Sequence, residues 1–179
     1  SPNVVNDVRR SGNDALTTAG YRLASLAARL SPAPVVSGTA FALSGPLALA
    51  MRSKRQMEER HLRRILPTAS SLAIRQMTQA AFESYARYYL ETFRLATVPM
   101  RRINSAFSVE GMEHIERSAE AGNGTILALP HLGGWEWAGR WLVGRGYTLT
   151  AVVERLDNDD LFDWFLGVRA ELGFNIIPL

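Results

Sequence analysis

The sequence predicts an α/β protein in which an N-terminal helical segment precedes a parallel β-α-β sheet core with flanking helices. Apolar residues recur at helical spacing through most of residues 1–109, whereas compact apolar runs alternate with helical patterns over residues 110–179. The 179 residues are 47% hydrophobic and 21% charged, ordinary values for one folded domain or a domain with a helical appendage. We expect a C-terminally truncated or processed chain, because it begins with Ser1 and stops within an apparent strand.

Two helical patterns open the chain. The first covers residues 13–30 and has a candidate N-cap at Asn13. The second is an uncharged run of 21 residues from Ser31 to Met51, just long enough to span a bilayer. Prolines and glycines interrupt this run and alanine dilutes its hydrophobicity. We therefore expect a buried or interfacial amphipathic helix in preference to a transmembrane one.

Positive charge is concentrated directly after this run. Residues 1–130 hold 16 Arg and Lys against 10 Asp and Glu, a net +6, while residues 131–179 hold 4 against 7, a net −3. Such a cluster suits phosphate, whether of nucleic acid or of anionic lipid headgroups, and a solvated helix face is an equally open interpretation. Six basic residues face only Glu58 and Glu59 in this cluster: Arg52, Lys54, Arg55, Arg60, Arg63 and Arg64.

A long helix is expected over residues 70–98, capped by Ser70 or Ser71. Its aromatic side chains recur at steps of three, four and four, so they form one stripe, which we interpret as facing the core. The stripe consists of Phe82, Tyr85, Tyr89 and Phe93.

From Glu110 onward the chain alternates between helix and strand. A short polar helix over 111–124 precedes the predicted strand TILALP, residues 125–130. A helix over 135–146 then leads to the strand YTLTAVVE, and a helix capped by Asp157 or Asn158 and closed by Gly173 leads to the strand FNIIPL. Short links between these elements imply right-handed crossovers and a parallel sheet.

Polar residues follow two of the predicted strands. Ligands of parallel sheets bind beyond the carboxyl ends of the strands. His131 comes directly after the first strand, and Glu154 and Arg155 lie at the end of the second. Sheet geometry is therefore expected to bring these three residues to one edge.

The turn after the first strand combines a histidine with a carboxylate. Gly133 and Gly134 allow a sharp turn, so that Glu136 in the next helix can fold back towards the His131 imidazole. A carboxylate bonded to one ring nitrogen fixes the tautomer and raises the basicity of the other nitrogen. This arrangement is a general base with its orienting partner, and the turn also offers backbone amides for a developing oxyanion.

The block LALPHLGGWEWAGRWL, residues 127–142, resembles the His-x4-Asp/Glu block of glycerolipid-type acyltransferases. More narrowly, the chain is similar to the bacterial lipid A lauroyl/myristoyl acyltransferase family, and within it to the phosphatidylinositol mannoside acyltransferase branch. The resemblance extends over ESYARYYLETFRL, VVERL and VRAELGFNIIPL, and so over most of the chain from about residue 82. Residues 13–66 agree in arrangement, though less specifically.

The resemblance implies transfer of a fatty acyl group from acyl-CoA or acyl carrier protein to a glycolipid hydroxyl, without a metal or other cofactor. It also implies a peripheral protein on an anionic membrane surface, at the cytoplasmic face of the bacterial inner membrane, that does not bind nucleic acid. By the same resemblance, residues 1–109 form a membrane-associating and acyl-groove segment. Residues 110–179 form the first, incomplete part of the α/β catalytic core.

The resemblance also assigns roles to single residues. His131 matches the catalytic base and Glu136 the acidic member of the block, where the mannoside branch commonly has Asp and the wider family uses both. A further acidic motif of the family is expected downstream of Leu179. Two residues match polar positions of the acceptor site, Glu154 and Arg169, and we add Arg155 as a phosphate partner.

The residues present favour direct transfer of the acyl group to the acceptor, without an acyl-enzyme intermediate. The chain contains no cysteine and no Gly-x-Ser-x-Gly elbow, so it offers no recognised nucleophile for an acyl-enzyme. We therefore expect the acceptor hydroxyl, deprotonated by His131, to attack the thioester directly.

Two functions of other classes stay open. A metal-dependent hydrolase would use His131, Glu136, Glu154 and the acidic run DNDD, although the His-Glu-x-x-His pattern is absent. A non-catalytic membrane-binding module would use only the amphipathic helices and the arginines. Nucleic-acid binding ranks below both, because the arginines are not interleaved with stacking aromatics. A dinucleotide site is disfavoured because no Gly-x-Gly-x-x-Gly occurs.

Overall fold

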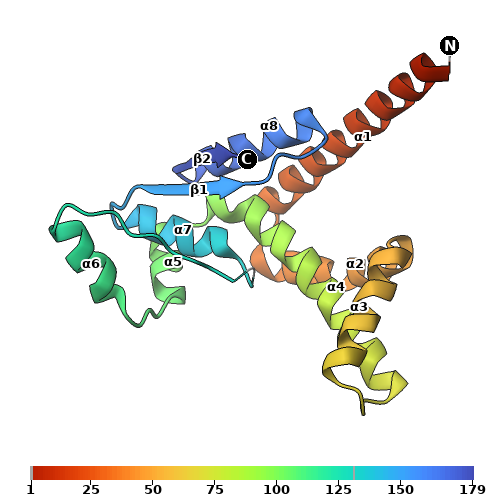
Figure 1. The fold of residues 1–179 in the computed structure, drawn as a ribbon, viewed down its shortest axis with the longest axis horizontal. Helices are drawn as coiled ribbons and strands as arrows, with labels where there is room; N and C mark the ends of the chain where they lie inside the picture. The colour runs from red at the N-terminus through yellow and green to blue at the C-terminus, as the bar shows by residue number, and fades with distance from the viewer. Residues whose placement is uncertain (1, 131) are drawn as a thin grey trace.

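A computed structural model describes residues 2–130 and 132–179, with side chains from residue 12 onward. The fold is mostly helical with one small parallel sheet, as Figure 1 shows. In chain order the elements are α1 (Pro2–Leu30), α2 (Ala33–Ala50), α3 (Arg52–Ile65), α4 (Ser71–Arg94), η1 (Leu95–Thr97), α5 (Met100–Ala106), α6 (Met112–Glu120), α7 (Trp135–Gly144), β1 (Leu149–Val153), α8 (Asp159–Glu171) and β2 (Phe174–Pro178). The α/β class predicted from the sequence is confirmed.

Helix α4 is the centre of the helical half, because α1, α2 and α3 all pack against it. Its predicted cap is confirmed, since the Ser70 hydroxyl accepts a hydrogen bond from the Ala73 amide at 3.2 Å. Helix α2 presents small side chains to α4, with Ala40 and Ser44 fully buried. Gln79 of α4 donates a hydrogen bond to the Ser44 hydroxyl at 2.6 Å, so a polar contact also fixes this helix pair.

Helix α1 corrects one sequence prediction. Asn13 is not an N-cap, because α1 begins at Pro2 and Asn13 lies inside it, with its carbonyl accepting from the Thr17 hydroxyl at 2.8 Å. No proline interrupts residues 3–12, and Gly12 inside a helix costs only about 1 kcal/mol. The helix therefore extends past the first capping residue that the sequence offers.

An aromatic cluster joins α1, α4 and α8. Tyr21, Tyr89, Phe93, Trp164 and Phe165 meet mostly edge to face, with ring centroids 4.9–6.5 Å apart. The stripe predicted on α4 is confirmed at Phe82 and Phe93, which are buried, but it is wrong at Tyr85, which is 38% exposed. The stripe deviates because α4 contacts different neighbours along its length, and Tyr85 meets Lys54 of the basic helix α3, whose Nζ lies 5.9 Å from the ring centroid.

The sheet consists of β1 and β2, paired in parallel from Leu149 opposite Phe174 to Val153 opposite Pro178. Helix α8 connects the two strands, and its predicted ends are confirmed: the Asn158 side chain accepts from the Leu161 amide at 2.9 Å, and Gly173 takes a left-handed φ of 85°. In Figure 1 the strands run between α7 and α8. The adjoining core contains Leu95, Val98, Ile103, Leu172 and Phe174, with tryptophans of α7 packed around it.

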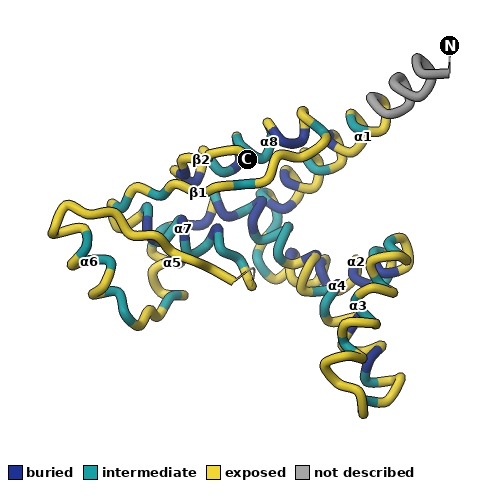
Figure 2. Tube along the Cα trace, in the orientation of Figure 1, coloured by how far each residue is buried: buried dark blue, intermediate teal, exposed yellow. Residues whose placement is uncertain are grey.

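The predicted strand TILALP is wrong for this structure. Residues 125–130 form no regular element and are exposed throughout, with Ile126 at 97% and Leu129 at 61% (Figure 2). A strand requires a neighbour that completes its hydrogen bonds, and within the described residues β1 pairs with β2 alone. An apolar run indicates that a segment favours burial, but it does not show which strand would pair with that segment.

A glycine in α7 tests how tightly this helix packs on the sheet. A Cβ at Gly139 would lie 2.6 Å from the Phe174 ring, whereas one at Gly167 of α8 would meet nothing within 4 Å. We expect Gly139→Ala to lower the free energy of unfolding by about 1–3 kcal/mol. Gly167→Ala, the matched control, should raise it by about 1 kcal/mol because alanine favours helix. Denaturant unfolding measures both, and equal effects would contradict the packing described here.

Candidate active site

The turn that leads into α7 is built on two glycines. Gly133 takes a left-handed φ of 64°, which side chains other than glycine rarely adopt. Gly134 is the N-cap of α7, and a Cβ there would lie 3.1 Å from the Trp137 ring. The carbonyl of Gly134 accepts a hydrogen bond from the Trp137 amide at 3.0 Å. The sharp glycine turn predicted before this helix is therefore confirmed.

His131 lies outside the described residues, so its pairing with Glu136 and its role as a base stay predictions. Its neighbours on both sides are described. The Leu132 amide donates a hydrogen bond to the Pro130 carbonyl at 2.7 Å.

Glu136 is the most deeply buried charged side chain of the described residues, with 1% of its surface exposed. It stands in the first turn of α7, as predicted. The Tyr88 hydroxyl of α4 lies 3.0 Å from one carboxylate oxygen and 3.1 Å from the other, and donates its proton to them. Arg169 Nη2 of α8 lies 3.6 Å from Oε1 of the carboxylate. The carboxylate therefore joins three helices.

Arg169 lies between the buried carboxylate and aromatic rings. Its guanidinium carbon is 5.4 Å from the Trp135 ring centroid and 5.7 Å from that of Phe165, within the range of cation–π attraction. Its side chain is 18% exposed. The sequence predicted Arg169 as an acceptor-binding residue, and the structure places it as the cationic neighbour of Glu136.

Burial and hydrogen bonding oppose each other at this carboxylate. Burial raises the pKa of Glu136 above its ordinary value, while the α7 backbone, the Tyr88 hydroxyl and Arg169 limit the rise. Burial, together with the adjacent Glu136 carboxylate, also raises the pKa of Tyr88. Tyr88 therefore keeps its proton at neutral pH and acts as a hydrogen-bond donor.

Glu154 and Arg155 lie just past β1, at the sheet end that the sequence predicted. Both side chains are exposed. Arg155 pairs with Asp159 at 2.9 Å and covers the Phe162 ring at 5.7 Å. Within the described residues neither side chain forms a hydrogen bond or ion pair with Glu136 or Arg169, so the predicted residues form two groups.

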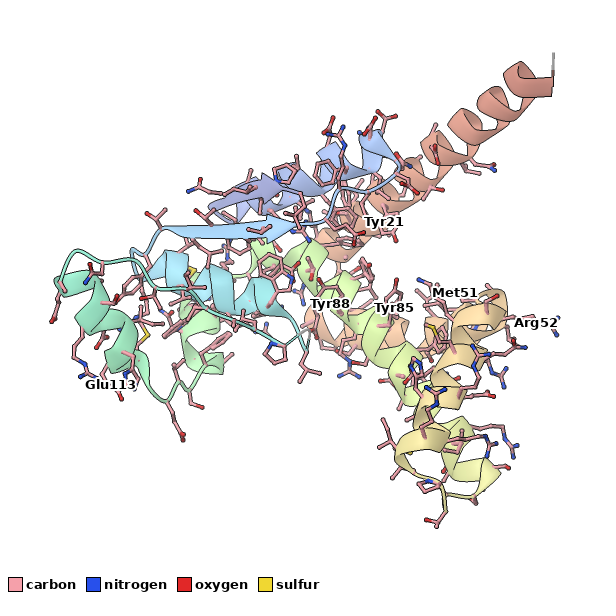
Figure 3. All side chains as sticks on the ribbon, viewed as in Figure 1. Tyr21, Met51, Arg52, Tyr85, Tyr88 and Glu113 are labelled. Atoms are coloured by element: carbon pink, nitrogen blue, oxygen red, sulfur yellow. The ribbon has the colours of Figure 1, made fainter. Side chains whose placement is uncertain are left out.

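Tyr88 is the site residue that sequence reasoning missed. The aromatic spacing drew attention to Tyr85 and Tyr89, and Tyr88 lies beside that stripe. Figure 3 shows Tyr88 on α4, nearer to α7 than Tyr85 is. A third tyrosine on the flank of an aromatic stripe is a weak signal for a buried polar partner, because the sequence does not reveal which helix covers that flank.

Metal chemistry was the alternative for the same residues. Among the side chains that the structure describes, no three His, Asp or Glu residues come together as ligands. The contacts of Glu136 are instead those of a carboxylate held by a hydroxyl and a guanidinium.

The fold and this site define an α/β chain with a buried acid at a glycine-rich helix start, as expected for an acyltransferase. The model of the bacterial lipid A biosynthesis acyltransferase family matches residues 18–179, and the chain belongs to that family. The resemblance noted from the sequence motifs is thereby confirmed.

Curated relatives agree with this assignment. A phosphatidylinositol mannoside acyltransferase of Mycobacterium tuberculosis is 38% identical over 122 residues, which cover 67% of this chain and 39% of the relative. The protein of the same name from Mycolicibacterium smegmatis is 32% identical over 164 residues, 92% of this chain and 53% of the relative. The chain thus spans about half or less of the length of these relatives.

The raised pKa of Glu136 gives a pH test with a definite sign. The folded protein binds this proton more tightly than the unfolded chain, so the corresponding stability is present at low pH and is lost as pH rises through the folded pKa. We expect the free energy of unfolding of the wild type, minus that of Glu136→Gln, to fall as the pH rises above about 4, the ordinary pKa of a glutamate. Glu120→Gln, an exposed position on α6, serves as the control. A difference that rises with pH would contradict the account.

Proposed function

We propose that the intact protein, with whatever sequence flanks these residues, transfers a fatty acyl group to a hydroxyl of a membrane glycolipid. The acceptor is of the phosphatidylinositol mannoside or lipid A type, and the donor is acyl-CoA or acyl carrier protein. The observation that carries the proposal is the family match over residues 18–179, with a buried acid five residues after His131. The two mycobacterial relatives support the mannoside as the first acceptor to test.

The proposed reaction needs no covalent intermediate. His131 removes the proton of the acceptor hydroxyl while that oxygen attacks the thioester carbonyl. The carbonyl oxygen becomes an oxyanion, and we assign its stabilisation to the backbone amides of the turn around Gly133 and Gly134. Collapse re-forms the carbonyl, breaks the carbon–sulfur bond and releases a thiol that takes the proton from His131. No cofactor takes part in this scheme.

The polar residues at the sheet end serve the acceptor in this proposal. Glu154 is exposed directly after β1, where it can accept hydrogen bonds from sugar hydroxyls. Arg155 carries its charge at the surface beside Asp159, available to a lipid phosphate. The Arg169 side chain is 18% exposed while it neighbours Glu136, and we assign to it the link between the acceptor and the buried carboxylate.

Helices α2 and α3 form the proposed contact with an anionic membrane. In the described part of the chain, α2 is the one helix long and apolar enough to span a bilayer by length and composition, at mean hydropathy 1.4. It carries no charge, and Phe41 and Leu49 on it are 68% and 66% exposed. The acids of α3 are half-buried, and Arg55 pairs with Glu59 at 3.0 Å. An apolar helix beside a basic one suits the interface of the inner membrane's cytoplasmic face.

The general base is tested by His131→Ala in the intact protein. We expect at least a 100-fold loss of acyl transfer from labelled acyl-CoA to phosphatidylinositol mannoside, because a positioned base contributes about 10²–10⁴-fold. His114→Ala on α6, an exposed histidine, is the control and should keep its activity. Circular dichroism confirms that both variants fold. Wild-type transfer by His131→Ala, or activity abolished by a chelator, would refute the mechanism.

Charge reversal tests the membrane surface. Changing Arg60, Arg63 and Arg64 to Glu should weaken binding to phosphatidylserine vesicles by at least tenfold, since each basic residue near the surface contributes about 1 kcal/mol. The control changes Arg101 and Arg102, which are exposed on α5, to Glu. This variant should bind the vesicles like the wild type. Vesicle sedimentation measures both. Unchanged binding by the α3 variant would exclude this surface, and vesicle binding without acyl transfer by the wild type would favour the membrane-binding module.

A further inference from the structure

Three tyrosines of α4 are close in sequence but differ in their contacts. Tyr85 and Tyr89 face one another, with their hydroxyl oxygens 3.5 Å apart. Tyr88 alone among them reaches α7, where its hydroxyl meets both oxygens of Glu136. The three side chains therefore provide a test position and two chemically matched controls on one helix.

Within the described residues, the Tyr88 hydroxyl donates to the Glu136 carboxylate alone. Glu136 is buried, and its carboxylate accepts from Tyr88 on one side and neighbours Arg169 on the other. The first turn of α7 is thereby fixed to α4 and α8 at the point where the chain leaves Gly134. Movement of this turn would break a hydrogen bond to a buried charged group, which is costly because no water replaces it.

We propose that Tyr88 is a positioning residue for acyl transfer, which acts through Glu136 to hold the glycine turn in the conformation that the reaction requires. The inference rests on the proposed function. Tyr88 itself donates to the carboxylate and takes no proton from the substrate. Its loss therefore lowers kcat and leaves the KM of the donor and acceptor unchanged.

The hydrogen bond between Tyr88 and Glu136 also predicts an effect on the pH dependence of kcat. Among the described residues, the charged and titratable groups that face the Glu136 carboxylate are Tyr88 from α4 and Arg169 from α8. On α7 itself, Arg140 extends to the carbonyls of Ala96 and Val98, at 3.2 and 3.3 Å. Because the Tyr88 hydroxyl lowers the pKa of Glu136, its removal raises that pKa further. The acid limb of kcat should then move to higher pH.

The experiment compares Tyr88→Phe, Glu136→Leu and their double variant in the intact protein, with Tyr85→Phe as the control. We expect Tyr88→Phe to lower kcat about tenfold without change in KM, and to move the acid limb up by about one pH unit. The double variant should be no worse than Glu136→Leu alone, because the two residues act as one unit. Tyr85→Phe should match the wild type.

The outcomes separate this inference from the proposed function. A wild-type protein without transfer overturns both. An active wild type with Tyr88→Phe indistinguishable from Tyr85→Phe, or with losses that multiply in the double variant, overturns the inference alone. Should Tyr88→Phe unfold, Glu136→Leu removes the acceptor of the same hydrogen bond. It must then show the kcat loss at unchanged KM, and an unchanged kcat overturns the inference.

Discussion

The fold around the candidate site depends on one buried carboxylate. Glu136 is 1% exposed, and an ionised carboxyl in such a place is unfavourable unless other groups replace its water. Tyr88 and Arg169 supply that replacement from two other helices, at 3.0 and 3.6 Å. The positions of α4, α7 and α8 are therefore coupled to the state of one side chain. A buried ion pair of this kind adds little net stability, because the cost of desolvating both charges offsets their attraction.

Packing reinforces the same arrangement. Tyr21, Phe93 and Trp164 join α1, α4 and α8 on one side, while Phe174 of β2 fits against Gly139 of α7 on the other. Arg140 adds a polar link from α7 to the carbonyls just after α4. The glycine turn at Gly133 and Gly134 thus leads into a helix that is held on several sides. A reactive residue placed beside such a turn has a defined scaffold to work from.

The sequence predicted the parts of this structure that depend on local patterns. Helix ends at Ser70 and Asn158, the glycine turn, both strands of the sheet and the placement of Glu136 in the first turn of α7 follow from spacing and capping chemistry. It failed where a distant partner decides the outcome. The TILALP run is apolar but finds no neighbouring strand in the described residues, and Tyr88 is indistinguishable from its neighbours until α7 is placed against it. The family resemblance was carried by several sequence blocks from about residue 82 onward, and the match over residues 18–179 confirmed it.

The central claim is that Glu136 is a buried carboxylate held by Tyr88, and a high-resolution crystal structure of the intact protein with its glycolipid acceptor tests it most directly. The account predicts that the Tyr88 hydroxyl lies within hydrogen-bond distance of the Glu136 carboxylate, with Arg169 on the other side and no water between them. A Glu136 side chain turned to solvent, with the Tyr88 hydroxyl bonded elsewhere, would contradict it.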